Sequence, residues 1–166
     1  MFGNFAKSLA YSSKLSRLEK KLKGDYDDNQ TVCKMCSFCC WAKPCNLSKE
    51  DVTIMAKHFG ITQQQLFEKY LVVDTAGVSF DEFSLTPIRK QWEIYAGGYL
   101  PDNATYDIDT PCCFLDESSR KCSLHDIAKP LGGREHECWN DEDPRPIQGF
   151  TEEELKDLVG WDGSQY

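Results

Sequence analysis

The sequence has little of what marks a membrane or exported protein. Its apolar runs extend over only a few residues, whereas a membrane-spanning helix needs about 20. The N-terminal segment MFGNFAKSLAYSSKLSRLEKKLKG lacks the continuous apolar stretch of a secretory signal. We therefore expect no transmembrane span and a cytoplasmic location.

Positive charge is also scarce. The chain has 27 Asp and Glu residues against 19 Lys and Arg, which gives a net charge of −8. A general nucleic-acid-binding protein needs a dominant basic face, so we expect no nucleic-acid partner. Hydrophobic residues make up 40% of the chain and aromatic residues 12%. This composition predicts a folded domain and not a disordered chain.

The common catalytic motifs are missing as well. The sequence contains no glycine-rich phosphate loop, no G-x-G-x-x-G, no H-E-x-x-H and no G-x-S-x-G. The C-x3-C-x2-C spacing of radical-SAM enzymes is absent too. A cysteine nucleophile paired with a histidine is left open. Together these absences favour a protein that is not an enzyme on its own.

Cysteine, by contrast, is abundant. The chain has nine cysteines, and five of them fall in TVCKMCSFCCWAKPC, residues 31–45. Because cytoplasmic thiols are kept reduced, such density indicates a metal site more often than disulfides. The centre of the segment is Cys33-x2-Cys36-x2-Cys39-Cys40. A C-x2-C-x2-C loop can wrap an iron–sulfur cube, and a tetrahedral zinc site is the alternative.

Four more cysteines follow in the second half of the chain, at positions 112, 113, 122 and 138. The side chains of consecutive residues diverge, so Cys39 and Cys40 are not expected to bind the same ion. His58 is expected to have a surface or core role. For the other side chains with ligand chemistry, metal binding is left open: Cys45, Cys113, His125 and His136.

The cysteine motifs resemble the YkgJ-like CxxCxxCC family, which is described as zinc- or iron-chelating. The resemblance rests on CKMCSFCC, on PCCFLDESSRKCSLHDIAKP and on a late cysteine, and it covers roughly residues 31 to 139. Cys113 stands where that family usually has proline, and Cys138 lies further from Pro130 than is typical. The resemblance implies a metal-ligand set drawn from these residues: Cys33, Cys36, Cys39, Cys40, Cys112, Cys122 and Cys138.

We predict a small, irregular, metal-stabilised α+β domain, with several short helices and a short antiparallel hairpin or sheet. Capping residues predict helices that begin after Ser48, Thr62 and Thr151. The second of these is predicted to run through TQQQLFEKYLVV, and short strands are expected in VSFDEFSL and QWEIYAGGYL. The predicted organisation has three parts: an N-terminal helix over 1–24, a cysteine-cluster domain over 25–145, and a C-terminal helix and tail over 146–166.

The predicted N-terminal helix is basic and amphipathic. It carries six Lys and Arg residues and one Glu, in a chain that is acidic overall. We favour a helix that packs its leucines on the body of the protein; contact with a membrane surface is possible but not favoured. Both terminal helices offer an apolar stripe, so we expect a protein partner.

Three functions follow from the cysteine pattern. The first is a small protein that holds an iron–sulfur cluster, [4Fe-4S] by its spacing, and acts as an electron-transfer, redox or accessory subunit. The second is a zinc-stabilised protein-interaction module. The third is a factor that passes metal to other proteins. The spacing favours the first.

Overall fold

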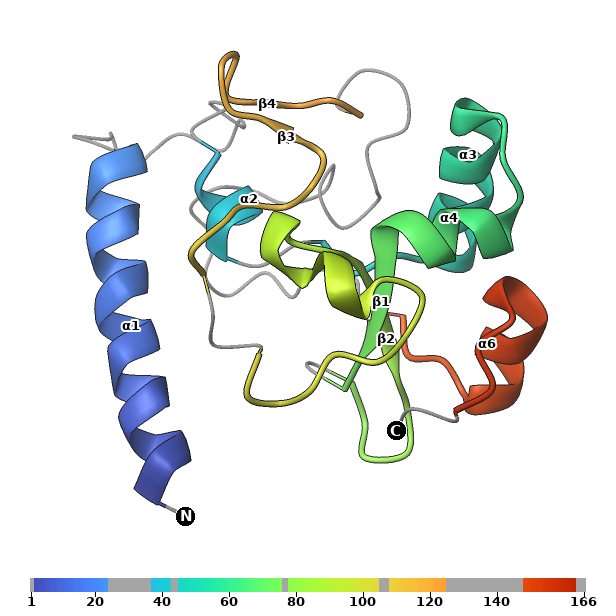
Figure 1. Ribbon diagram of the computed structural model, residues 1–166, viewed down its shortest axis with the longest axis horizontal. Coiled ribbons are helices and arrows are strands. Elements are labelled where there is room, and N and C mark those ends of the chain that lie inside the picture. The colour runs from blue at the N-terminus through green and yellow to red at the C-terminus, as the bar shows by residue number, and fades with distance from the viewer. Residues whose placement is uncertain are drawn as a thin grey trace.

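The computed structural model describes residues 2–23, 37–42, 45–75, 78–104, 108–124 and 148–163. Its architecture confirms the predicted α+β class, with several helices and two small antiparallel hairpins (Figure 1). Helices and hairpins follow one another along the chain as α1 (Phe2–Lys23), α2 (Phe38–Ala42), α3 (Lys49–Phe59), α4 (Gln63–Tyr70), β1 (Leu71–Asp74), β2 (Ser84–Pro87), the 3-10 helix η1 (Lys90–Tyr95), β3 (Leu115–Asp116), β4 (Lys121–Cys122) and α6 (Glu152–Val159).

Three helices begin with the capping box that the sequence predicts. At the start of α3, the Ser48 hydroxyl accepts a hydrogen bond from the backbone N–H of Asp51, and the Asp51 carboxylate accepts one from the backbone N–H of Ser48. The same reciprocal pair starts α4 at Thr62 and α6 at Thr151. These bonds satisfy N–H groups that have no partner within the helix. The starting points of all three helices are therefore confirmed.

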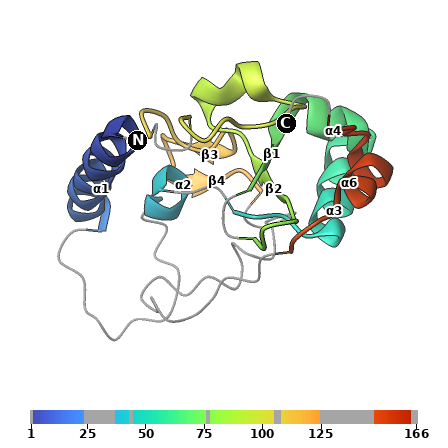
Figure 2. The ribbon, with the colours of Figure 1, turned by 90° about the horizontal axis from the view of Figure 1, so that it is seen from below.

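The main hydrophobic core lies between the helical layer and the first hairpin. The strands β1 and β2 pair antiparallel, with Val72 opposite Thr86, and every residue of both strands is buried. On one side they are covered by α3, α4 and α6, which cluster at one end of the molecule in both views (Figures 1 and 2). Leu66 of α4 and Leu155 of α6 are fully buried in this core.

Two local predictions were wrong. The helix predicted through LVV ends at Tyr70, and residues 71–74 form β1, because their branched side chains bury completely when paired with β2. The strand predicted in QWEIY is the 3-10 helix η1, closed by bonds such as Trp92 N–H to the Arg89 carbonyl at 2.9 Å. This helix buries Trp92 against a second small cluster with Val72 and Leu100.

The long helix α1 lies at the end opposite α3, α4 and α6, beside α2 (Figure 2). Hydrogen bonds and an ion pair join it to the body. The Tyr11 hydroxyl donates to the carbonyl of Ala42 at 3.4 Å, and Lys14 forms an ion pair with Asp109. Nearer its end, the carbonyl of Leu22 accepts a hydrogen bond from Arg120 at 3.1 Å. The helix thus contacts the segments that carry the cysteines.

Among the residues that the structure describes, no helix is long and apolar enough to span a bilayer.

Replacing Leu155 by alanine tests whether α6 is part of the main core. We expect Leu155→Ala to lower the free energy of unfolding by about 2–5 kcal/mol, because it leaves a cavity between α6 and α4. Urea denaturation measures the change. Leu9→Ala is the control, since Leu9 is 57% exposed, and we expect a change within about 0.5 kcal/mol. Equal losses in both variants would contradict this packing.

Candidate metal centre

The described part of the first cysteine motif, residues 37–42, begins with a tight turn. Ser37 follows Cys36 directly and has a φ of 65°, in the left-handed region that residues other than glycine seldom adopt. Its carbonyl accepts hydrogen bonds from the backbone N–H of Cys40 at 3.0 Å and of Trp41 at 3.3 Å. This turn starts α2, the helix that carries Cys39 and Cys40. Cys40 is half-buried and packs against the main core.

The second motif forms a compact loop and hairpin. The backbone N–H of Leu115 donates to the carbonyl of Cys112 at 3.0 Å, which closes a turn just ahead of β3. The hairpin β3–β4 then places Cys122 opposite Leu115. Leu115 thus links the two cysteines: it bonds to one and pairs with the other. Phe114 and Leu115 are both buried, so the apolar residues of the FLD sequence anchor the loop.

The third residue of FLD, Asp116, closes the hairpin turn. Its carboxylate accepts hydrogen bonds from the Ser118 hydroxyl at 2.7 Å, the Ser118 backbone N–H at 3.0 Å and the Ser119 hydroxyl at 2.8 Å. Chiefly through Ser118, these bonds stabilise the ionised form and lower the pKa of Asp116 to about 2. Arg120 completes the turn with a φ of 56°.

A backbone hydrogen bond joins the two motifs. The N–H of Cys112 donates to the carbonyl of Cys40 at 2.8 Å. Cys112 belongs to the main core cluster, and Cys40, Cys113 and Cys122 all pack against that cluster. The fold therefore gathers cysteines from both halves of the chain on one flank of a single core.

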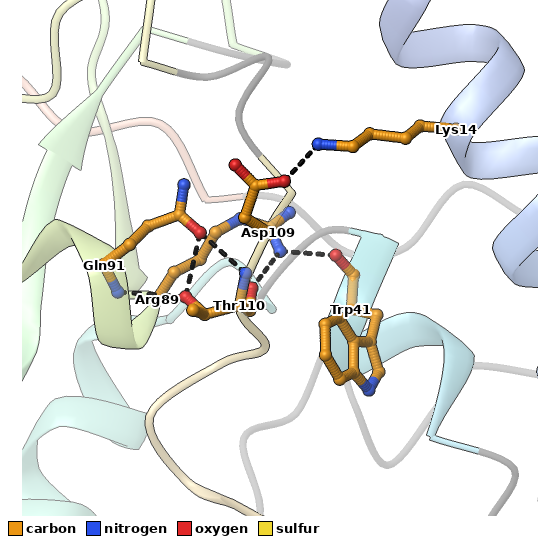
Figure 3. A network of polar contacts seen from close by, with 6 residues as sticks. All are labelled: Lys14, Trp41, Arg89, Gln91, Asp109 and Thr110. Carbon is orange, nitrogen blue, oxygen red and sulfur yellow. Dashed lines mark hydrogen bonds and ion pairs between the residues drawn. The ribbon is translucent and has the colours of Figure 1, made fainter.

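A buried arginine reinforces this junction (Figure 3). Arg89 lies between β2 and η1, is only 1% exposed and pairs through its backbone with Cys112. Its Nη1 donates to the carbonyls of Trp41 and, at 3.1 Å, of Thr110, while its Nη2 donates to the carbonyl of Ala42 at 2.6 Å. The guanidinium therefore binds the end of α2 and the loop before Cys112 at the same time.

A second set of hydrogen bonds holds the loop before Cys112 in place. The amide oxygen of Gln91 accepts hydrogen bonds from the Thr110 backbone N–H at 2.6 Å and from its hydroxyl at 2.9 Å. In return, the Thr110 hydroxyl accepts one from the Gln91 backbone N–H at 2.9 Å (Figure 3). These contacts hold the loop against η1 independently of Arg89.

The pKa values of the two ionisable groups at the junction shift in opposite directions, and both shifts favour the neutral form. Desolvation lowers the pKa of Arg89 to about 10, so the guanidinium stays cationic at neutral pH. The pKa of the Cys112 thiol is raised well above its usual value, first by a hydrogen bond with the Cys113 side chain and then by burial. Without metal, the site therefore combines a fixed positive charge with a neutral thiol.

The predicted ligands fall into two groups. The structure brings the segments of Cys40, Cys112 and Cys122 together, and Cys39 lies on α2 beside Cys40. The rest of the proposed ligands, together with two histidines, lie outside the described residues: Cys33, Cys36, Cys138, His125 and His136. Within the described ranges, no three side chains form a group that could hold a metal ion. The complete ligand set stays a prediction.

Two other candidates lie away from the junction. His58 is exposed on α3, where its ring meets Phe59 edge to face at 5.0 Å, in agreement with the expected surface role. Cys45 is half-buried, and its carbonyl accepts a hydrogen bond from the Thr86 hydroxyl at 3.4 Å. This bond ties the end of the first cysteine segment to β2.

The position of Arg89 at the junction could not be predicted from the sequence. The only signal for it was a single basic residue at the end of the otherwise uncharged run SLTPIR. A single basic residue in such a run is expected to lie at the surface. The neighbouring residues do not indicate that carbonyls from α2 and the Thr110 loop will surround it.

The donors that the fold collects here are thiols, which suit zinc and iron. Together with the spacing of the motifs, they indicate a cysteine-rich metal-binding domain. A family model, CxxCxxCC, described as a "putative zinc- or iron-chelating domain", matches residues 32–146. The chain belongs to this family, which confirms the resemblance seen in its motifs. The searches of curated proteins and of solved structures gave no match.

The depressed pKa of Asp116 makes a testable contribution to stability. Because the folded state favours the ionised carboxylate, this contribution is present above the usual pKa of 3.8 and is lost as the pH falls towards 2. We expect Asp116→Asn to reduce the loss of stability between pH 4 and pH 2. Urea denaturation of both proteins across this range measures it. Identical pH profiles would contradict the assignment, and NMR titration of the wild-type carboxyl gives the pKa directly.

Proposed function

We propose that the chain holds an iron–sulfur cluster, most simply one [4Fe-4S], with ligands drawn from both cysteine motifs. The C-x2-C-x2-C spacing of Cys33, Cys36 and Cys39 is the spacing by which ferredoxin loops bind successive corners of a cube. In that arrangement the remaining ligand comes from elsewhere in the chain. Cys112, Cys122 and Cys138 are the candidates in the second half.

The observation that supports a shared centre is the hydrogen bond from Cys112 N–H to the Cys40 carbonyl. It fixes the helix that carries Cys39 and Cys40 directly against the second motif. The two motifs therefore lie side by side at this junction, as a shared centre requires. Independent metal sites on separate loops would not require this contact.

We further propose that the cluster serves a partner protein, in electron transfer, redox sensing or an accessory role. Two of the gathered cysteines, Cys40 and Cys122, are only half-buried, which places this end of the site close to the surface. The neighbouring helix α1 presents Lys14, Arg17 and Lys21 around a pocket that is also lined by Leu18, Ile108 and Asp109, the ion-pair partner of Lys14. A mixed basic and apolar surface of this kind suits an acidic protein partner.

A zinc-stabilised interaction module is the second candidate. It is supported by the hairpin β3–β4, in which Cys122 lies on β4, after a four-residue turn that Asp116 closes. A hairpin that carries a cysteine can supply one thiolate to a tetrahedral zinc site. The thiol donors suit either metal.

Spectroscopy and metal analysis separate the two candidates. The full chain is purified without exposure to oxygen, and its iron, sulfide and zinc contents are measured alongside UV–visible and EPR spectra. We expect a coloured protein with iron and acid-labile sulfide, and an EPR signal after one-electron reduction. A colourless protein with stoichiometric zinc would overturn the iron–sulfur proposal in favour of the zinc module.

Substitution of cysteines in the second motif tests the shared centre. We expect Cys112→Ser and Cys122→Ser each to reduce bound metal by a large factor, because the centre loses a sulfur ligand. Ser123→Ala is the matched control: Ser123 is exposed and follows Cys122 directly. Metal content per folded protein is the measurement, with circular dichroism as the check on folding. Full retention of metal in both cysteine variants would restrict the site to the first motif.

A further inference from the structure

Within the part of the chain that the structure describes, the buried Arg89 has no carboxylate partner. Among the described residues, its guanidinium contacts three backbone carbonyls and the ring of Trp92, whose centroid lies 4.9 Å away. Its Nε is buried without a hydrogen-bond partner. Asp109, in the same network, pairs instead with Lys14 of α1 (Figure 3). A buried charge without a counter-charge normally costs several kcal/mol, so this position favours a nearby anion.

Among the described residues, those of the cysteine site can supply such an anion. Arg89 pairs through its backbone with Cys112, and the carbonyls that it binds include that of Trp41, directly after Cys40. Metal-bound cysteines are thiolates, and four thiolates on a divalent ion leave a net charge of about −2. A cation fixed beside this site would offset that charge, as hydrogen bonds to metal-bound sulfur do in other sites.

The guanidinium also has the geometry of a clamp. It accepts no hydrogen bonds and donates in a planar fork. Its Nη1 bridges the two segments, because it donates to the carbonyl of Trp41 in α2 and to that of Thr110 ahead of Cys112, while its Nη2 donates to the carbonyl of Ala42 at the end of α2. A lysine at this position would keep the charge, but its single ammonium group could not bind carbonyls on both segments in the same fixed plane.

We propose that Arg89 is a positioning residue of the metal centre, which holds the two cysteine segments together and offsets the charge of their thiolates. This inference rests on the proposed function only in requiring a thiolate-bound metal. It applies equally to iron and to zinc.

Cobalt binding tests the role of Arg89 separately from the identity of the natural metal. The full chain is stripped of metal and titrated with Co2+ without oxygen, and the thiolate-to-cobalt absorption reports both affinity and thiolate coordination. Arg89→Met removes the charge and the fork but keeps an unbranched side chain. Arg89→Lys keeps only the charge. Lys90→Met is the matched control, because it removes one positive charge from an exposed neighbour that pairs with Glu117 at 2.9 Å.

We expect Arg89→Met to weaken Co2+ binding by about 10–100-fold and to reduce the thiolate absorption per bound ion, as outer-shell substitutions do at metal sites. Arg89→Lys should recover part of the affinity, and Lys90→Met should stay within about twofold of wild type. A purely structural role would lower stability but leave the affinity and spectrum of the folded fraction unchanged, and that result would overturn the proposal.

Other outcomes are also decisive. If Arg89→Met does not fold, as judged by circular dichroism, the comparison of Arg89→Lys with Lys90→Met decides, and equal affinities overturn the proposal. A wild-type chain that binds Co2+ without thiolate absorption would defeat the metal centre itself, and this inference with it. A normal wild-type spectrum with an unaffected Arg89→Met variant would defeat only the role of Arg89.

Discussion

The junction of the two cysteine motifs is built on one short contact, the hydrogen bond between the Cys112 N–H and the Cys40 carbonyl. The hydrophobic core supports the Cys112 side of this contact, because Cys112, Phe114 and Leu115 are all buried. The other side rests on a five-residue helix, which is too short to be stable alone. The fork of Arg89 supplies what that helix lacks, since it binds the carbonyls that end it.

Elements fixed by nearby residues could be predicted from the sequence. The capping boxes at Ser48, Thr62 and Thr151 involve residues three positions apart, so their pattern is visible in the sequence and their helices were found correctly. The strand β1 was missed because its conformation depends on pairing with β2, which lies beyond a loop. Similarly, η1 alternates like a strand, but it is set by the burial of Trp92 in a cluster of distant residues.

The same division applies to the candidate site. The C-x2-C-x2-C spacing identified the first cysteine motif, and the resemblance to the CxxCxxCC family predicted that it acts together with the second. The fold does bring the segments of Cys40, Cys112 and Cys122 to one flank of the core. Which sulfurs bind the metal stays a prediction. Arg89 could not have been identified, because the carbonyls around it belong to segments far away in sequence. Because every residue has a backbone carbonyl, the residue types do not show which carbonyls will accept hydrogen bonds from Arg89.

The hairpin β3–β4 has a consequence for the order in which the protein assembles. Its stabilising contacts join residues only a few positions apart, from Asp116 to Ser119 and from Leu115 to Cys122. Local hairpins form within microseconds, whereas closure of the long loop between residues 40 and 112 carries a larger entropic cost. We therefore expect the hairpin to form before α2 docks on it. If both motifs share one centre, as proposed, metal binding by that centre would follow the closure of the long loop.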